Sequence, residues 1–324
     1  MNIALTLVPS IIAVFFGSVV FVNAVEYLGS SLKLSKSFVG SIVSPFFTSF
    51  PELIIFLLAV MYSNHGQGHE IALGVIFGEP FMASSIAYTL VLAAILLSRF
   101  GGGKPKSYLE VDRSLMYPFI FISLLYPVLI LASYFSTPVN YLLGILFLAS
   151  YVIYIYTMRK GKPDFGEDEA EAPYLSKFMK PMTASVIQIL VSIALLYYGS
   201  ELLIEAISGI SVNLGIDPLT MSILVIPLVT TIPETIPGMI WGYQGKGTLS
   251  IGALVGEKVL YSTLYPGIAL LMIPWVINES AVISVVTAEV ISLVYLLYIR
   301  RGRMPLYALS FGLVFFVLFA YLVL

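Results

Sequence analysis

The chain has 324 residues, of which 59% are hydrophobic and only 10% are charged. A soluble domain carries about 25% charged residues, so this composition excludes a water-soluble protein and predicts an integral membrane protein. A formal net charge of -2 argues against a nucleic-acid partner, and the absence of cysteine excludes disulfides and thiolate metal sites.

Polar segments divide the chain into ten apolar runs, each of about the 20 residues that a membrane-spanning helix needs. No basic region precedes the first run, so we expect a membrane helix there rather than a signal peptide. The sequence therefore predicts an all-α polytopic membrane protein with ten transmembrane helices. The predicted helices cover residues 4–31, 36–62, 71–98, 114–135, 139–158, 182–210, 217–243, 249–275, 281–299 and 305–323.

The distribution of basic residues predicts the orientation of these helices. Fifteen of the 16 Lys and Arg residues lie in the odd-numbered loops, and the even-numbered loops and both tails contain none. By the positive-inside rule the odd-numbered loops face the cytoplasm, and both termini then lie outside the cell membrane. Residues 160–180 contain the only long polar segment, which we interpret as a cytoplasmic linker.

The segments before and after this linker, residues 1–159 and 181–324, contain an internal repeat. Because each half holds five helices, an odd number, the second half enters the membrane from the opposite side, and the repeats are predicted to be inverted. The repeated positions, at offsets of 182 and then 178, are Pro45/Pro227, Thr48/Thr230, Pro51/Pro233 and Glu52/Glu234, then Gly74/Gly252, Gly78/Gly256 and Glu79/Glu257.

Two Pro-Glu pairs, Pro51-Glu52 and Pro233-Glu234, lie inside predicted helices. Proline cannot donate to the carbonyl four residues earlier, so each pair is expected to expose backbone oxygen beside a carboxylate. Unpaired backbone at membrane depth is tolerated where it lines a cavity. An all-oxygen shell suits hard cations such as Ca²⁺, Na⁺ or Mg²⁺. The repeated pair therefore predicts a cation site at the repeat interface.

Glu79 and Glu257 each follow a G-x-x-x-G spacing, which lets helices approach closely. Each lies near the centre of its predicted helix, where an ionised group costs on the order of 3 kcal/mol on insertion scales. We therefore expect all four glutamates to share cations or protons, and protons to compete with the metal.

Lys258 is the one basic residue deep inside a predicted helix. The sequence leaves three arrangements open. Its ammonium is a candidate internal counter-charge for one of the four glutamates, in which case it fills a monovalent cation position. It can instead pair with Glu289 of another helix, or lie at the rim of the membrane.

These motifs resemble the two alpha-repeats of the Ca²⁺/cation antiporter superfamily, which includes the sodium/calcium exchangers. That family carries G-T-S-x-P-E in its second and seventh helices and G-N-x-x-G-S in the helices that follow. The matching stretches are FTSFPE (47–52), TTIPE (230–234), GVIFGE (74–79) and GALVGE (252–257). Glu52 and Glu234 would then be the central metal carboxylates, and the hydroxyl or carbonyl oxygens would come from Thr48, Ser49, Thr230 and Thr231.

The departures from the family motif concern the ligand set. Val75 and Ala253 replace the asparagines of G-N, and Glu79 and Glu257 stand where the family has serine. More carboxylate favours a divalent ion, protons or both over the Na⁺ coordination of a typical exchanger.

The predicted function is secondary antiport of a divalent cation, with Ca²⁺ favoured, against Na⁺ or H⁺. The resemblance implies that the first helix of each half slides to switch access, with Gly17 and Gly199 allowing close contact. We expect a single chain without a cofactor. The alternatives are an antiporter or channel for another divalent ion such as Mg²⁺, and a membrane enzyme, for which no H-E-x-x-H motif is present.

Overall fold

The computed structural model describes residues 3–31, 42, 45–46, 49–61, 67–100, 107–160 and 172–323. The chain forms two compact units, and each unit takes segments from both halves of the sequence. Unit 1 comprises Met1–Val75 and Asp164–Glu234, and unit 2 comprises Ile76–Pro163 and Thr235–Leu324. The division falls inside two continuous helices, α5 (Gly68–Met82) and α11 (Pro218–Tyr243).

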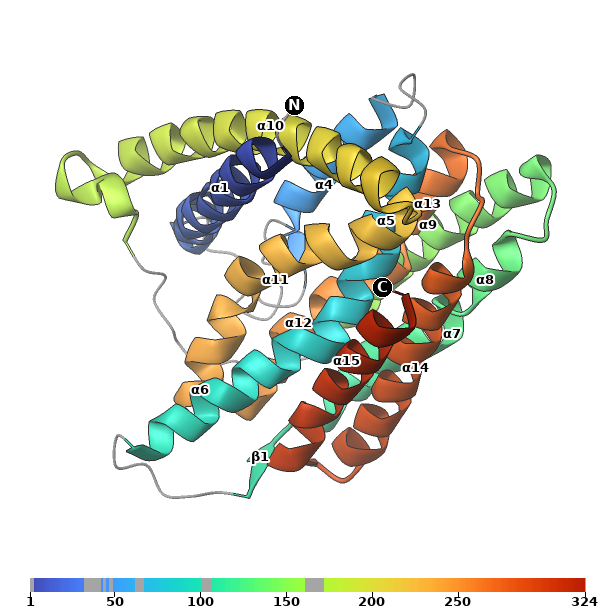
Figure 1. Cartoon of the computed structure of the whole chain (residues 1–324). Helices are drawn as coiled ribbons and strands as arrows, with labels where there is room; N and C mark the ends of the chain where they lie inside the picture. The colour runs from blue at the N-terminus through green and yellow to red at the C-terminus, as the bar shows by residue number, and fades with distance from the viewer. Residues whose placement is uncertain are drawn as a thin grey trace. The chain divides into compact units, whose positions relative to one another are not determined.

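Unit 1 is built around two long helices, α1 (Ile3–Ser31) and α10 (Pro181–Leu214), which lie against each other (Figure 1). The unit also contains α4 (Phe50–Met61), the short 3₁₀ helix η5 (Tyr174–Lys177) and the adjoining parts of α5 and α11. Gly215 ends α10 in the left-handed conformation, with φ of 68°. Asp217 then caps α11 by accepting hydrogen bonds from the backbone N–H groups of Leu219 and Thr220 at 2.9 and 3.2 Å.

The contact between α1 and α10 is reciprocal. A Cβ at Gly17 would lie 3.1 Å from Leu196 Cγ, and a Cβ at Gly199 would lie 2.9 Å from Ala13 Cβ and 3.1 Å from Val14 N. Gly17 and Gly199 are separated by 182 positions, as are Val14 and Leu196. Each helix therefore places its glycine against the equivalent residues of the other.

Unit 2 contains the remaining helices, a π-helical segment and one small sheet (Figure 1). Its elements are η3 (Ala83–Ala87), α6 (Tyr88–Phe100), β1 (Tyr108–Glu110), η4 (Arg113–Leu115), α7 (Met116–Leu125), α8 (Val128–Ala132), α9 (Thr137–Lys160), α12 (Gly247–Ser262), α13 (Leu264–Met272), α14 (Glu279–Arg300), β2 (Arg303–Pro305), η6 (Leu306–Ser310) and α15 (Phe311–Val323).

The all-helical prediction is confirmed apart from this sheet, and seven helices of the described ranges are long and apolar enough to cross a membrane. The spans Arg113–Ala132, Pro181–Leu214 and Glu279–Arg300 begin and end within four residues of their predictions. The predicted helix 249–275 is divided into α12 and α13 because Thr263 leaves the helical conformation, with φ of -140° and ψ of -72°. Of the predicted helix 36–62, the structure describes a helix of twelve residues, Phe50–Met61.

The sequence did not predict the β1–β2 ribbon. The two strands are antiparallel, with Leu109 opposite Met304. Both side chains are buried, which explains why such a short pair forms. In the predicted ten-helix arrangement, the two strands belong to the third and ninth loops.

Candidate metal centre

Glu52 and Glu234 come together inside unit 1. Glu52 lies in the first turn of α4 and is fully buried, and Glu234 lies in the second half of α11 and is 3% exposed. One carboxylate oxygen of each residue lies within 4.8 Å of the other. This separation lets a single metal ion contact both, because Ca²⁺–oxygen distances are about 2.3–2.6 Å.

The charge of this pair needs compensation. Neither carboxylate oxygen of Glu52 makes a hydrogen bond with any described residue, although Glu234 and Thr230 lie close enough to affect it electrostatically. Two ionised carboxylates in a buried site repel each other and lose their hydration. The pair is therefore suited to holding a cation or a proton.

Three of the residues predicted to supply hydroxyl or carbonyl ligands lie in unit 1 and are buried. Ser49 precedes α4, and its Oγ donates to the carbonyl of Pro45 at 2.8 Å. Thr230 Oγ1 donates to the carbonyl of Ile226 at 3.1 Å, and Thr231 is 3% exposed. A hydroxyl whose proton is donated to its own helix keeps lone pairs that can face a cation. Thr48 lies outside the described residues.

The two Pro-Glu pairs differ in their local structure. Pro51 is the second residue of α4, and just before this helix the backbone N–H of Ser49 donates to the carbonyl of Pro45 at 3.1 Å. Pro233 lies inside α11, which continues from Pro218 to Tyr243 without a break. The sequence predicts an interruption of this helix, but α11 has no break. Pro233 only lacks the N–H that would otherwise pair with the carbonyl of Val229.

Glu79 and Glu257 belong to unit 2 and are buried, with 2% and 6% exposure. Glu79 precedes Pro80 in α5, and Glu257 lies in α12, within electrostatic range of Tyr88. Two carboxylates are thus buried in each unit.

The glycines that precede these glutamates are not equivalent in their packing. A Cβ at Gly74 would lie 1.6 Å from Ser222 Oγ and 2.5 Å from Ser222 Cβ, so α5 and α11 touch at this position. A Cβ at Gly252 would meet only the Leu115 side chain, at 3.6 Å. The expected close approach of helices occurs at Gly74 and not at Gly252.

Lys258 of α12 is fully buried in unit 2, where its side chain reaches α14 and α7. Its Nζ donates to Ser292 Oγ at 2.6 Å and lies 5.8 Å from the centre of the Phe119 ring. The carboxylate of Glu289 lies within electrostatic range. The surroundings of Lys258 are therefore mixed, with one hydroxyl, one aromatic face and one neighbouring carboxylate.

Sequence reasoning missed a pair of buried amides in unit 1. Gln188 of α10 and Asn23 of α1 are 1% and 7% exposed, and Gln188 Nε2 donates to Asn23 Oδ1 at 3.0 Å. The backbone N–H of Tyr174 donates to Asn23 Oδ1 at 3.1 Å, and that of Leu175 donates to Gln188 Oε1 at 2.7 Å. These bonds fasten the end of the linker to both helices. The available signal was two amides inside otherwise apolar runs.

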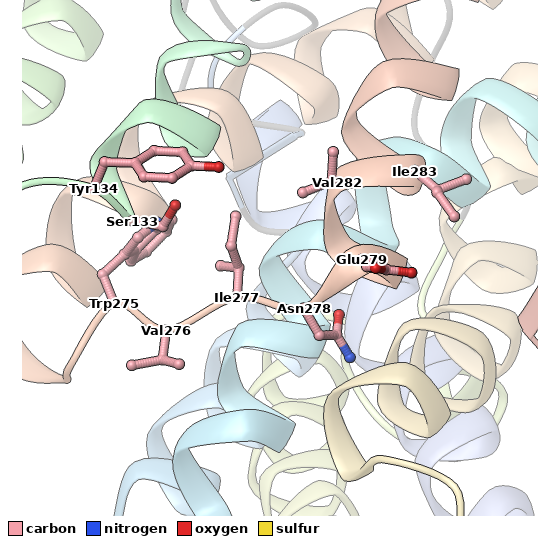
Figure 2. A pocket seen from close by; sticks show the side chains of 9 residues that line it. All are labelled: Ser133, Tyr134, Trp275, Val276, Ile277, Asn278, Glu279, Val282 and Ile283. Atoms are coloured by element: carbon pink, nitrogen blue, oxygen red, sulfur yellow. The ribbon is translucent and has the colours of Figure 1, made fainter.

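A cavity of about 610 Å³ in unit 2 does not have the chemistry of a cation site (Figure 2). Its single carboxylate, Glu279, is exposed, and most of its other lining side chains are apolar or aromatic. Asn278 caps α14 by accepting a hydrogen bond from the N–H of Ala281 at 2.9 Å. One exposed carboxylate cannot replace the hydration shell of a divalent ion.

A chain of apolar helices with carboxylates buried inside both of its units has the architecture of a membrane cation transporter. The chain belongs to the sodium/calcium exchanger protein family, whose sequence pattern matches residues 2–160 and 184–324. It is therefore an integral membrane protein of a cation-antiporter family.

Curated relatives resemble the chain along most of its length. It is 23% identical over 268 residues to a protein described as antiporter CaxA of Alkalimonas amylolytica, covering 81% of this chain and 78% of the relative. It is 21% identical over 250 residues to membrane protein MJ0091 of Methanocaldococcus jannaschii, covering 77% and 75%.

Solved structures share the fold. An H⁺/Ca²⁺ exchanger, CAX, matches with a TM-score of 0.75 at 18% identity, covering 100% of this chain and 85% of that one. The sodium-calcium exchanger NCX_Mj matches with a TM-score of 0.61 at 17% identity, covering 98% of both chains. YfkE matches with a TM-score of 0.72 at 14% identity, covering 98% and 90%.

Proposed function

We propose that the protein exchanges a divalent cation, with Ca²⁺ favoured, for Na⁺ or H⁺ by alternating access to a cluster of buried glutamates. The observation that carries this proposal is the pair Glu52 and Glu234, which are buried and have carboxylate oxygens within 4.8 Å. Membership of the sodium/calcium exchanger family supports exchange over a channel, an enzyme or a carrier dedicated to Mg²⁺.

The proposed cation ligands are oxygens from both halves of the chain. Glu52 and Glu234 supply the central negative charge. Glu79 and Glu257 complete the cluster, because they follow the Pro-Glu motifs at equivalent places and are buried in the same way. Neutral oxygens come from the hydroxyl or carbonyl groups of Thr48, Ser49, Thr230 and Thr231.

Exchange follows from the charge of this cluster. Four carboxylates cannot stay ionised and empty in a low-dielectric site, so a departing divalent ion must be replaced by protons or by monovalent cations. The two kinds of occupant compete for the same oxygens, which couples inward movement of one to outward movement of the other.

Ten helices arranged as two inverted repeats would place this cluster at the centre of the membrane. The reciprocal contact of Gly17 and Gly199 supports this arrangement, because an inverted repeat brings equivalent residues into equivalent contacts. The β1–β2 ribbon supports the proposed orientation, because both of its loops are predicted to be cytoplasmic. We further propose that α1 and α10 slide to switch access, that residues 160–180 are a cytoplasmic linker between repeats 1–159 and 181–324, and that one chain suffices.

Calcium uptake into proteoliposomes tests the proposed function. Labelled Ca²⁺ should accumulate only when an opposing Na⁺ or pH gradient is imposed, and the gradient that drives uptake identifies the counter-ion. Glu52→Gln and Glu234→Gln should each abolish uptake, whereas Glu279→Gln, which removes an exposed carboxylate, should leave it within about twofold of the parent. Parental uptake by both buried-glutamate variants would refute the site, and uptake without a gradient would refute exchange.

A further inference from the structure

The transport cycle proposed above gives no role to Lys258, although this residue is held by several specific contacts. Its ammonium is fully buried, and its nearest polar partner is the hydroxyl of Ser292 in α14, at 2.6 Å. That hydroxyl in turn donates to the carbonyl of Ala288 at 2.6 Å, so it is held in place by its own helix. The ammonium therefore occupies a defined position rather than a loose one.

The neighbouring carboxylate belongs to Glu289, one turn before Ser292 in α14. Glu289 is half-buried, and one of its oxygens is buried with no hydrogen bond to a described residue. Its electrostatic neighbours are Lys258 of α12, together with Ser123 and Tyr126 from the α7–α8 segment. Lys258 is thus the one cation that compensates this carboxylate among the residues that the structure describes around it.

The third contact comes from α7, which packs against both α12 and α14. The face of the Phe119 ring lies 5.8 Å from Lys258 Nζ, a distance at which a ring face attracts a cation. A single ammonium therefore makes polar or electrostatic contacts with α14 and with α7 while its backbone belongs to α12. These contacts fix the rotation of α12 about its own axis.

The rotation of α12 matters because Glu257 precedes Lys258. Successive residues of an α-helix point about 100° apart, so a helix that is held by Lys258 also holds the direction of Glu257. Glu257 is 6% exposed and lies within electrostatic range of Tyr88, whereas Lys258 points toward Ser292. The two neighbouring charges thus have separate surroundings.

We infer that Lys258 is a positioning residue that balances Glu289 and orients Glu257, and that it is not a counter-charge for the transported ion. The role of Glu257 in this inference rests on the proposed function. The pairing itself does not, since Lys258, Ser292 and Glu289 all belong to unit 2, where Ser292 holds the ammonium one turn from the buried oxygen of Glu289.

A double-mutant cycle tests the pairing without any transport measurement. Removing one member of a buried charge pair leaves the other uncompensated, whereas removing both is tolerated. We expect Lys258→Met to lower the apparent melting temperature in detergent by roughly 5–10 °C, and the other single variant, Glu289→Gln, to lower it as well. Lys258→Met/Glu289→Gln should recover at least half of that loss. Ser262→Ala, which removes a buried hydroxyl bonded within α12, controls for general disturbance of the helix.

Uptake per folded molecule tests the positioning role. The single variant Lys258→Met should lose at least about tenfold in maximal Ca²⁺ uptake, and the double variant should return to within about threefold of the parent. Its half-saturating Ca²⁺ concentration and the charge moved per Ca²⁺ should match those of the parent. An unchanged rate per folded molecule in Lys258→Met would overturn positioning, and so would a double variant as impaired as the single one.

Two further outcomes separate this inference from the proposed function. A change in the charge moved per Ca²⁺ on loss of Lys258, with no rescue by Glu289→Gln, would assign the ammonium to the transport site and overturn the inference. If the parent protein moves no Ca²⁺, the proposed function fails, and the melting-temperature cycle still decides whether Lys258 and Glu289 form a pair.

Discussion

Gly74 and Gly252 hold equivalent places in the two predicted repeats, but substitution by alanine should affect them in opposite directions. At Gly74 the new Cβ would lie 1.6 Å from Ser222 Oγ, 2.5 Å from Ser222 Cβ and 3.0 Å from the carbonyl oxygen of Leu219. Rotation of the hydroxyl relieves only the first of these contacts. The backbones of α5 and α11 must therefore separate, which we place at the upper part of the 1–3 kcal/mol range for overpacking, about 2–3 kcal/mol.

At Gly252 the nearest atoms to a new Cβ belong to the Leu115 side chain, at 3.6 and 3.9 Å, which is ordinary van der Waals contact. Alanine is the better helix former by about 1 kcal/mol, so Gly252→Ala should be neutral or stabilising. The two variants thus form a matched pair with the same chemical change in equivalent sequence positions.

The assay is the apparent melting temperature in detergent, followed by fluorescence-detected size-exclusion chromatography. Gly74→Ala should melt roughly 5–10 °C below the parent, and Gly252→Ala should melt at or above it. Adding Ser222→Gly to Gly74→Ala removes the two closest contacts and should recover at least half of the loss. Equal melting temperatures for the two single variants, or a double variant no better than Gly74→Ala, would refute the packing argument.

Two other predictions concern helices α1 and α10. Gly199→Ala should lower the melting temperature more than Gly17→Ala. At Gly199 the new methyl group would lie 2.9 Å from Ala13 Cβ and 3.1 Å from the backbone nitrogen of Val14, whereas at Gly17 the two nearest atoms belong to the end of the Leu196 side chain and the third, Leu195 Cβ, is 3.3 Å away. The reverse order of melting temperatures would contradict this. Gln188→Leu should accelerate tryptic cleavage after exposed Lys177 by at least about fivefold. The change removes the acceptor of the Leu175 N–H and the donor to Asn23 Oδ1, at a cost of about 1–3 kcal/mol, whereas the Tyr174 N–H keeps Asn23 as its acceptor. Ser192→Ala, one turn further along α10, should leave the cleavage rate unchanged, and equal cleavage in both variants would show that the amides do not fasten the linker.

The sequence predicted those features that are set by hydrophobicity and charge. Long apolar runs produce helices wherever the chain must satisfy its backbone in lipid, so the ends of α1, α10, α11 and α14 lie within four residues of their predictions. Glutamates inside apolar runs are costly unless they are enclosed, and Glu52, Glu79, Glu234 and Glu257 are all buried.

The features that the sequence did not predict depend on contacts between distant segments. The non-helical backbone of Thr263 divides one apolar run into α12 and α13, although Pro227 and Pro233 leave α11 continuous. A proline does not by itself determine whether a helix ends, because the neighbouring packing can hold the segment helical. The β1–β2 ribbon pairs residues about 195 positions apart, and no local pattern signals it.

The neighbours of Lys258 also could not be predicted from the sequence. Helical periodicity places Lys258 and Glu257 on different sides of α12, but it does not identify the helix that each side faces. The sequence therefore leaves three arrangements open, and the structure identifies Ser292, Glu289 and Phe119 as the neighbours of the ammonium.

The reciprocal crossing of α1 and α10 has a consequence for the ancestry of the chain. Gly17 faces Leu195 and Leu196, and Gly199 faces their counterparts Ala13 and Val14. Because the two helices contribute equivalent residues to this crossing, one half of the sequence contains all the residues that the crossing needs. The same crossing would therefore also form between two identical five-helix proteins inserted in opposite directions. If two such copies were fused, a larger side chain on one helix would have to be matched by a smaller one on the other at this crossing. The two halves would then be free to diverge in their ligands, but their residues at this crossing would have to change together.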